Sequence, residues 1–106
     1  DLDRAAAVPA PPEGCIRLGL VATYARWKGH LTFLDALASL SLDTPWRAYI
    51  VGGAIYRTAG SQFSADELRR EIDRRKLNDR VFLTGFLKRR GAVMRALDIV
   101  VHASTK

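Results

Sequence analysis

Residues 16–30, with the sequence IRLGLVATYARWKGH, decide how the rest of the chain is interpreted. Residues 16–22 are almost continuously apolar, which is typical of a strand covered on both faces of a parallel sheet. Residues 23–29 then form a basic, glycine-containing loop before a helix. Because α/β sheets meet phosphates at strand ends and helix N-termini, this stretch predicts an anionic ligand near the loop.

Beyond this stretch, the hydrophobic periodicity alternates between that of helices and that of strands. It predicts helices over 30–40, 64–76 and 88–97, and further strands over 46–51, 81–84 and 99–103. Such alternation favours a parallel sheet with right-handed crossovers. We therefore expect an α/β, Rossmann-like, three-layer fold with four parallel strands in the order 3-2-1-4. The crevice would lie between strands one and four, with Lys28 near Ser104 and Thr105.

The helix over 64–76 has the clearest local signal. Ser64 and Glu67 have the spacing of a capping box, and Leu68 and Ile72 are the expected core contacts. Two pairs are spaced for i,i+4 ion pairs on the surface: Asp66 with Arg70, and Glu71 with Arg75.

Composition limits the class of protein. With 106 residues, 48% hydrophobic and 26% charged, the chain has the balance of one folded soluble domain. It shows no apolar run near the roughly 18 residues of a membrane span and no leader sequence, and Cys15 is its only cysteine, so we expect a cytoplasmic protein. With only His30 and His102 besides, no metal site is expected. His102 falls in the fourth strand and is interpreted as a hydrogen-bonded core histidine.

Residues 1–14 are rich in alanine and proline, which favours an extended linker over a packed element. The chain starts without methionine and stops after the fourth strand, with no helix to cover that strand. Because a parallel sheet needs both faces covered, we expect a piece of a longer protein.

The positive charge is concentrated in the second half. Residues 1–53 hold five basic and five acidic residues, whereas residues 54–106 hold twelve and six, which places the whole net charge of +6 there. Such a field attracts phosphates, nucleic acid or an acidic membrane surface. Acidic residues interleave with the basic runs, and only Phe82 and Phe86 are near, so a solvated face is favoured over a nucleic-acid footprint.

Two loops are candidate binding sites. Arg26 and Lys28 follow the first strand, where a lysine can meet a diphosphate beside helix amides, although two exposed basic residues would give the same pattern. Gly52 and Gly53 follow the second strand and permit either a close ligand approach or an ordinary turn. Neither a G-x-G-x-x-G motif nor a Walker loop is present.

Four segments together resemble a known family: VATYARWKGHLTFLDAL, YIVGGAIYRTAGSQFSADEL, DRVFLTGF and ALDIVVHAST. They are similar to the C-terminal domain of retaining group 1 glycosyltransferases, the glycogen-synthase-like family 4 with two-Rossmann (GT-B) architecture. The resemblance makes residues 15–106 a partial nucleotide-sugar-binding domain whose C-terminal part is missing. Residues 1–14 resemble the interdomain linker.

The resemblance implies a nucleotide-diphosphate sugar donor and hexosyl transfer with retention by a longer parent protein. The family's diphosphate-binding lysine corresponds to Lys28. Many members have an arginine where this chain has Thr23, which leaves Arg26 as the nearby replacement. The remaining donor-binding loops correspond to Gly52, Gly53, Gly85, Phe86 and Leu87, with Ser104 and Thr105 at the crevice.

The family's E-x(7)-E motif and its N-terminal acceptor domain are absent from these residues. We therefore assign no catalytic residue, metal or cofactor to the chain, and we expect residues 1–106 alone to be inactive. A peripheral membrane contact of the parent stays open, and no nucleic-acid partner is expected. The alternative is a basic binding module for nucleic acid or an anionic membrane surface.

Overall fold

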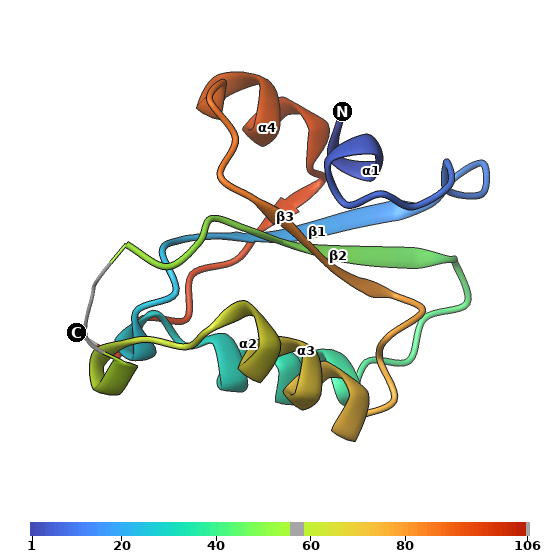
Figure 1. Cartoon of the computed structure of the whole chain (residues 1–106). Helices are drawn as coiled ribbons and strands as arrows, with labels where there is room; N and C mark the ends of the chain where they lie inside the picture. Colours follow the sequence, from blue (N-terminus) through green and yellow to red (C-terminus); the bar gives the residue numbers. More distant parts are fainter. Residues whose placement is uncertain (56–58, 106) are drawn as a thin grey trace.

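A computed structural model describes residues 1–55 and 59–105. Its sheet has four parallel strands, β1 (Ile16–Val21), β2 (Trp46–Val51), β3 (Val81–Gly85) and β4 (Ile99–Val100). Their order is β3-β2-β1-β4, which confirms the expected topology. Helices cover both faces of the sheet (Figure 1).

One face of the sheet packs on α2 (His30–Ala38) and α3 (Ala65–Arg74), and the other packs on α1 (Leu2–Ala5) and α4 (Arg90–Ala96) (Figure 1). Two short 3-10 turns, η1 (Arg26–Lys28) and η2 (Ala59–Ser61), lie in the loops. Because successive side chains of a strand point to opposite faces, β2 contributes to both cores. Ala48 and Ile50 pack with the α2 and α3 side, whereas Tyr49 and Val51 pack with Leu2 on the other.

α3 forms as its sequence predicts. The Ser64 hydroxyl accepts from the Glu67 amide and the Glu67 carboxylate accepts from the Ser64 amide, which completes the capping box. Leu68 and Ile72 are buried. The expected ion pair of Glu71 with Arg75 is present at 2.8 Å, but Asp66 pairs with Arg69, not Arg70, at 3.3 Å. Residues three apart share a helix face as well as those four apart, so sequence spacing does not choose between them.

The end of the chain differs from the prediction. β4 has two residues, and residues 101–105 leave the sheet after the Val101 amide donates to the Gly19 carbonyl. β4 is an edge strand whose pairing stops at Gly19 and Val100, so its second half is not held in the sheet. His102 is consequently exposed, and its interpretation as a core histidine is wrong.

The first residues also differ from the prediction, because they pack on the sheet and are not extended. The Asp1 side chain caps α1 at the Asp3 amide, and Leu2 is only 2% exposed. Composition gave no sign of this packing, because the groups that hold α1 lie in β1 and β2. That residues 1–14 link two domains stays a prediction. Within the described residues, no helix is long and apolar enough to cross a membrane.

Candidate functional site

Three loops meet at the carboxyl edge of the sheet, after β1, β2 and β3. Gly52 begins the loop after β2 with a φ of 141°, and a Cβ there would overlap the carbonyl oxygen of Ala22. Its amide donates to the Gly85 carbonyl at 3.0 Å. Only glycine fits such a backbone approach, so Gly52 joins the ends of all three strands.

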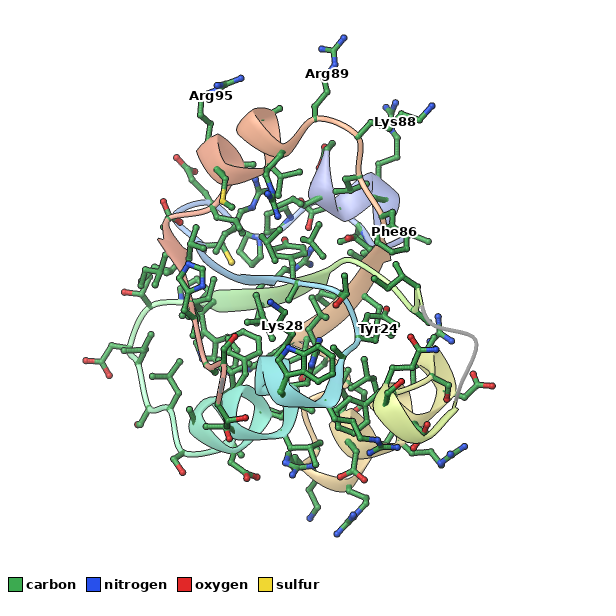
Figure 2. The ribbon with its side chains drawn as sticks, turned by 90° about the vertical axis from the view of Figure 1, so that its left-hand side faces the viewer. Tyr24, Lys28, Phe86, Lys88, Arg89 and Arg95 are labelled. Atoms are coloured by element: carbon green, nitrogen blue, oxygen red, sulfur yellow. The ribbon has the colours of Figure 1, made fainter. Side chains whose placement is uncertain are left out.

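Phe86 lies beside this junction. A Cβ on Gly53 would come within 2.8 Å of the Phe86 ring, so the aromatic side chain covers the glycine closely. Phe86 is nevertheless 60% exposed, and Figure 2 shows where it lies. The structure therefore brings Gly52, Gly53, Gly85 and Phe86 together, whereas their role as donor-binding loops stays a prediction.

A cavity of about 130 Å³ opens at the same edge. Val21, Ala22, Val51 and Val93 line it with apolar groups, and its remaining lining residues are Thr23, Phe86, Leu87 and Arg90. The sequence analysis did not single out Arg90. The structure starts α4 at this residue, two residues later than predicted, and so places it at the edge of the sheet.

Lys28 ends η1, and Gly29 follows it with a φ of 82° as the N-cap of α2. No side chain caps this helix, and an uncapped helix N-terminus favours an anion. Among the described residues no acidic side chain pairs with Lys28, which is half-buried. A lysine ammonium beside an uncapped helix N-terminus is an arrangement suited to a phosphate.

The tail after β4 packs against this loop. A Cβ on Gly29 would overlap the Ala103 carbonyl, and the Thr105 amide donates to the Trp27 carbonyl at 2.8 Å. Ser104 lies between these two contacts. The expected closeness of Lys28 to the tail at Ser104 and Thr105 is therefore confirmed.

Arg26 is held away from the Lys28 side of the loop. Its guanidinium Nη2 lies 3.2 Å from Glu67 Oε2, and its Cζ lies 4.4 Å from the centre of the Phe63 ring. The Ser64 amide and, to a smaller extent, Arg26 hold the pKa of Glu67 below its usual value. Arg26 therefore has an anionic partner already, whereas Lys28 has none within the described part of the chain.

His30 is fully buried beneath the loop, at the first residue of α2. Its ring meets the rings of Tyr24 and Phe63 edge-on, at centroid distances of 5.8 and 5.7 Å. Neither ring nitrogen has a hydrogen-bond partner among the described residues. Burial lowers the pKa of His30 to about 4, so the imidazole is neutral at physiological pH. Sequence reasoning considered this residue only as a metal ligand, and helical periodicity gave no sign of its aromatic neighbours.

The loop between β2 and α3 is tied to the loop after β1. The Tyr24 amide donates to the Gly53 carbonyl at 2.9 Å, and the Phe63 amide donates to the Tyr24 carbonyl at 2.8 Å. Residues 56–58 of this loop lie outside the described residues. Within the described ranges no cluster of three metal-ligating side chains occurs. The edge thus joins a lysine, a helix N-terminus without a side-chain cap and an apolar cavity, which suits a ligand with both an anionic and a flat apolar part.

This arrangement defines a class: a parallel α/β domain whose loops meet at the carboxyl ends of its strands, where such domains bind their ligands. The chain belongs to the group 1 glycosyl transferases, because the model of that family matches residues 15–106.

Solved structures agree with this assignment. Alr3699/HepE from Anabaena, in complex with UDP, is 30% identical with a TM-score of 0.74, over 88% of this chain and 24% of that one. Its complex with UDP-glucose gives 31% identity and a TM-score of 0.73, over 86% and 24%.

A glycosyltransferase from Rickettsia africae shares the fold, at 22% identity and a TM-score of 0.74 over 90% of this chain and 24% of that one. No curated protein matches the sequence. The chain thus spans about 24% of the length of these structures.

Proposed function

We propose that the chain is part of the donor-binding domain of a retaining hexosyltransferase and that it holds the diphosphate of a nucleotide sugar. The observation that carries the proposal is the Lys28 ammonium, which has no acidic partner in the described residues and lies beside the uncapped N-terminus of α2. Both features favour the negative charge that grows on the diphosphate as the glycosidic bond breaks.

The nucleoside is proposed to lie toward Gly85, Phe86 and Leu87. The exposed Phe86 ring and the adjacent apolar cavity suit a flat base, and Arg90 at the cavity suits ribose or phosphate oxygens. Uridine is the base we propose, because the Anabaena protein, 30% identical, has been solved with UDP. Gly52 and Gly53 would let the ligand approach the backbone, with Ser104 and Thr105 on the opposite side of Lys28.

Arg26 is proposed as a second diphosphate contact only after it exchanges Glu67 for the ligand. In the structure its guanidinium is neutralised, so Lys28 carries the larger share of the proposed role. The sugar and the acceptor need groups that we do not assign to this chain. Retaining transfer requires the diphosphate, the sugar and the acceptor to be held together. We therefore expect residues 1–106 alone to bind the nucleotide weakly and to transfer no sugar.

Titration of the labelled chain with UDP, followed by amide chemical shifts, tests the proposal. We expect shifts at residues 28–31 and 85–87, and their loss in Lys28→Ala. Lys76→Ala is the matched control, because it removes an exposed lysine from the far end of α3 and should leave the shifts unchanged. A parallel titration with single-stranded DNA tests the alternative binding module. Salt-sensitive shifts over residues 69–90 with DNA, and none with UDP, would contradict the proposal.

A further inference from the structure

The two basic helices of the second half differ in how their charges are compensated. On α3, arginine side chains pair with carboxylates: Arg69 with Asp66 at 3.3 Å, Arg74 with Glu71 at 3.2 Å, and Arg75 with Glu71 and Asp35, each at 2.8 Å. The positive charge of α3 is therefore largely offset within the protein. This agrees with the solvated face that the sequence predicted for that helix.

The cations around α4 have no such compensation. Arg4, Lys88, Arg89, Arg90 and Arg95 are all exposed, and none pairs with an acidic side chain in residues 1–55 and 59–105. We call these five residues the α4 surface. Lys88, Arg89 and Arg95 project away from the body of the protein on the side of α4 (Figure 2). The net positive charge of the chain is thus displayed mainly on this one side.

An apolar groove lies within the α4 surface. It has a volume of about 350 Å³ and runs between α1 and α4. Its apolar lining consists of Leu2, Leu87, Ala92, Val93 and Ala96, with Asp1, Lys88 and Arg89 as the charged residues. Basic side chains therefore border a groove with an apolar lining.

We propose that the α4 surface docks the protein on an anionic membrane. Unpaired Lys and Arg side chains are attracted by acidic headgroups, and neighbouring apolar groups enter the boundary between headgroups and acyl chains. The groove supplies those apolar groups, with Ala92 exposed and Ala96 half-buried along it. The surface would lie on the membrane without spanning it.

The same surface suits nucleic acid less well. Binding to single strands uses aromatic platforms for successive bases, and reading a duplex uses side chains such as Asn and Gln on an inserted helix. The described residues of the α4 surface and of its groove include no aromatic side chain, and α4 has seven residues with neither Asn nor Gln. The charge is present without the groups that recognise bases.

The α4 surface adjoins the proposed donor site at Leu87 and Arg90, so the test changes only residues outside that site. Lys88, Arg89 and Arg95 lie outside the lining of the cavity at the carboxyl edge, so they can be changed without touching it. Arg90 lines that cavity and is left unchanged in the test below.

The test is sedimentation of the chain with vesicles of phosphatidylcholine and phosphatidylglycerol, compared with vesicles of phosphatidylcholine alone. We expect binding to the mixed vesicles only, weakening as salt rises. The variant Lys88→Gln, Arg89→Gln, Arg95→Gln should bind roughly a hundredfold more weakly. Its control, Arg70→Gln, Arg74→Gln, Lys76→Gln, removes the same charge from α3 and the turn that follows it, and should keep the original binding. Circular dichroism shows whether both variants are folded.

Four outcomes would overturn the inference. They are no binding of the original chain to mixed vesicles at low salt, equal binding to uncharged vesicles, equal losses in the two variants, and tighter binding to an oligonucleotide that only the α4 variant loses. If the α4 variant does not fold, Arg89→Gln and Arg95→Gln tested singly should each weaken binding more than Arg70→Gln does, and their failure to do so also contradicts it.

Discussion

The Tyr49 hydroxyl, on the α1 side of β2, donates a hydrogen bond to the carboxylate of Asp3, which lies 46 residues earlier. The same carboxylate accepts from Arg17 at 2.6 Å and from Arg47 at 2.9 Å. Burial, together with the hydrogen bond to Asp3, raises the pKa of Tyr49 to about 12. One carboxylate therefore fastens α1 to both β1 and β2.

We predict that Asp3→Ala lowers the free energy of unfolding by about 3 kcal/mol, because it leaves two guanidinium groups and a hydroxyl without their shared partner. Arg17 and Arg47 are partly exposed, so water recovers some of the loss. Urea denaturation followed by circular dichroism measures the change. Asp43→Ala, at an exposed position, should cost less than about 0.5 kcal/mol. Equal effects of the two substitutions would show that the α1 contact does not contribute to stability.

His30 makes the stability depend on pH. Its pKa falls from 6.5 to about 4 on folding. Between these two values the unfolded chain binds a proton at His30, whereas the folded chain does not. The stability is complete above pH 6.5 and decreases as the pH falls toward 4, by up to about 1.4 kcal/mol per pH unit.

The variant His30→Leu should lack this decrease, whereas His102→Leu, at the exposed histidine, should retain it. Chemical denaturation at several pH values between 6.5 and 4 checks this. An unchanged slope in His30→Leu would mean that other groups cause the decrease.

Gly52→Ala should lower the stability by about 3 kcal/mol, because the new Cβ would overlap the Ala22 carbonyl and the backbone would be strained. We also expect weaker UDP binding, because the three loops would separate. Gly60→Ala is the control, since nothing lies within 4 Å of a Cβ there. Thermal unfolding of both variants measures the difference, and a Gly52→Ala variant as stable as Gly60→Ala would contradict the expected overlap.

Glu67→Gln tests whether Arg26 can serve the donor. Glutamine can still cap α3 but does not neutralise Arg26, so we expect UDP to bind two- to threefold more tightly, roughly the effect of one exposed ion pair. Adding Arg26→Gln to this variant should remove the gain. Calorimetric titration gives both affinities. If Glu67→Gln binds UDP no better than the original chain, Arg26 has no part in the site and Lys28 acts alone.

Local patterns predicted the elements that depend on local interactions. The capping box at Ser64 and the apolar strands gave α3 and the sheet, and the alternation of strands with helices gave the order β3-β2-β1-β4. The features that the sequence did not predict depend on partners that are distant in sequence. α1 is held by groups 14 to 46 residues away, and Arg26 is held by Glu67, 41 residues away. The length of β4 depends on how far an edge strand stays paired, which its apolar composition does not determine. The functional roles of Lys28 and the glycine loops stay predictions.

The position of β1 has a consequence for synthesis on the ribosome. The Arg17 amide donates to the Asp98 carboxylate and the Asp98 amide donates to the Arg17 carbonyl, both at 2.8 Å, so β1 begins beside a residue that is made 81 positions later. The elements from β1 to β3 can assemble as they emerge from the ribosome. One edge of β1 stays unpaired until β4 has been made. During that interval the newly made chain exposes an apolar strand edge, which is the feature that attracts chaperones or causes aggregation. Pairing of β4 with β1 is therefore the step that covers this exposed edge in the newly made protein.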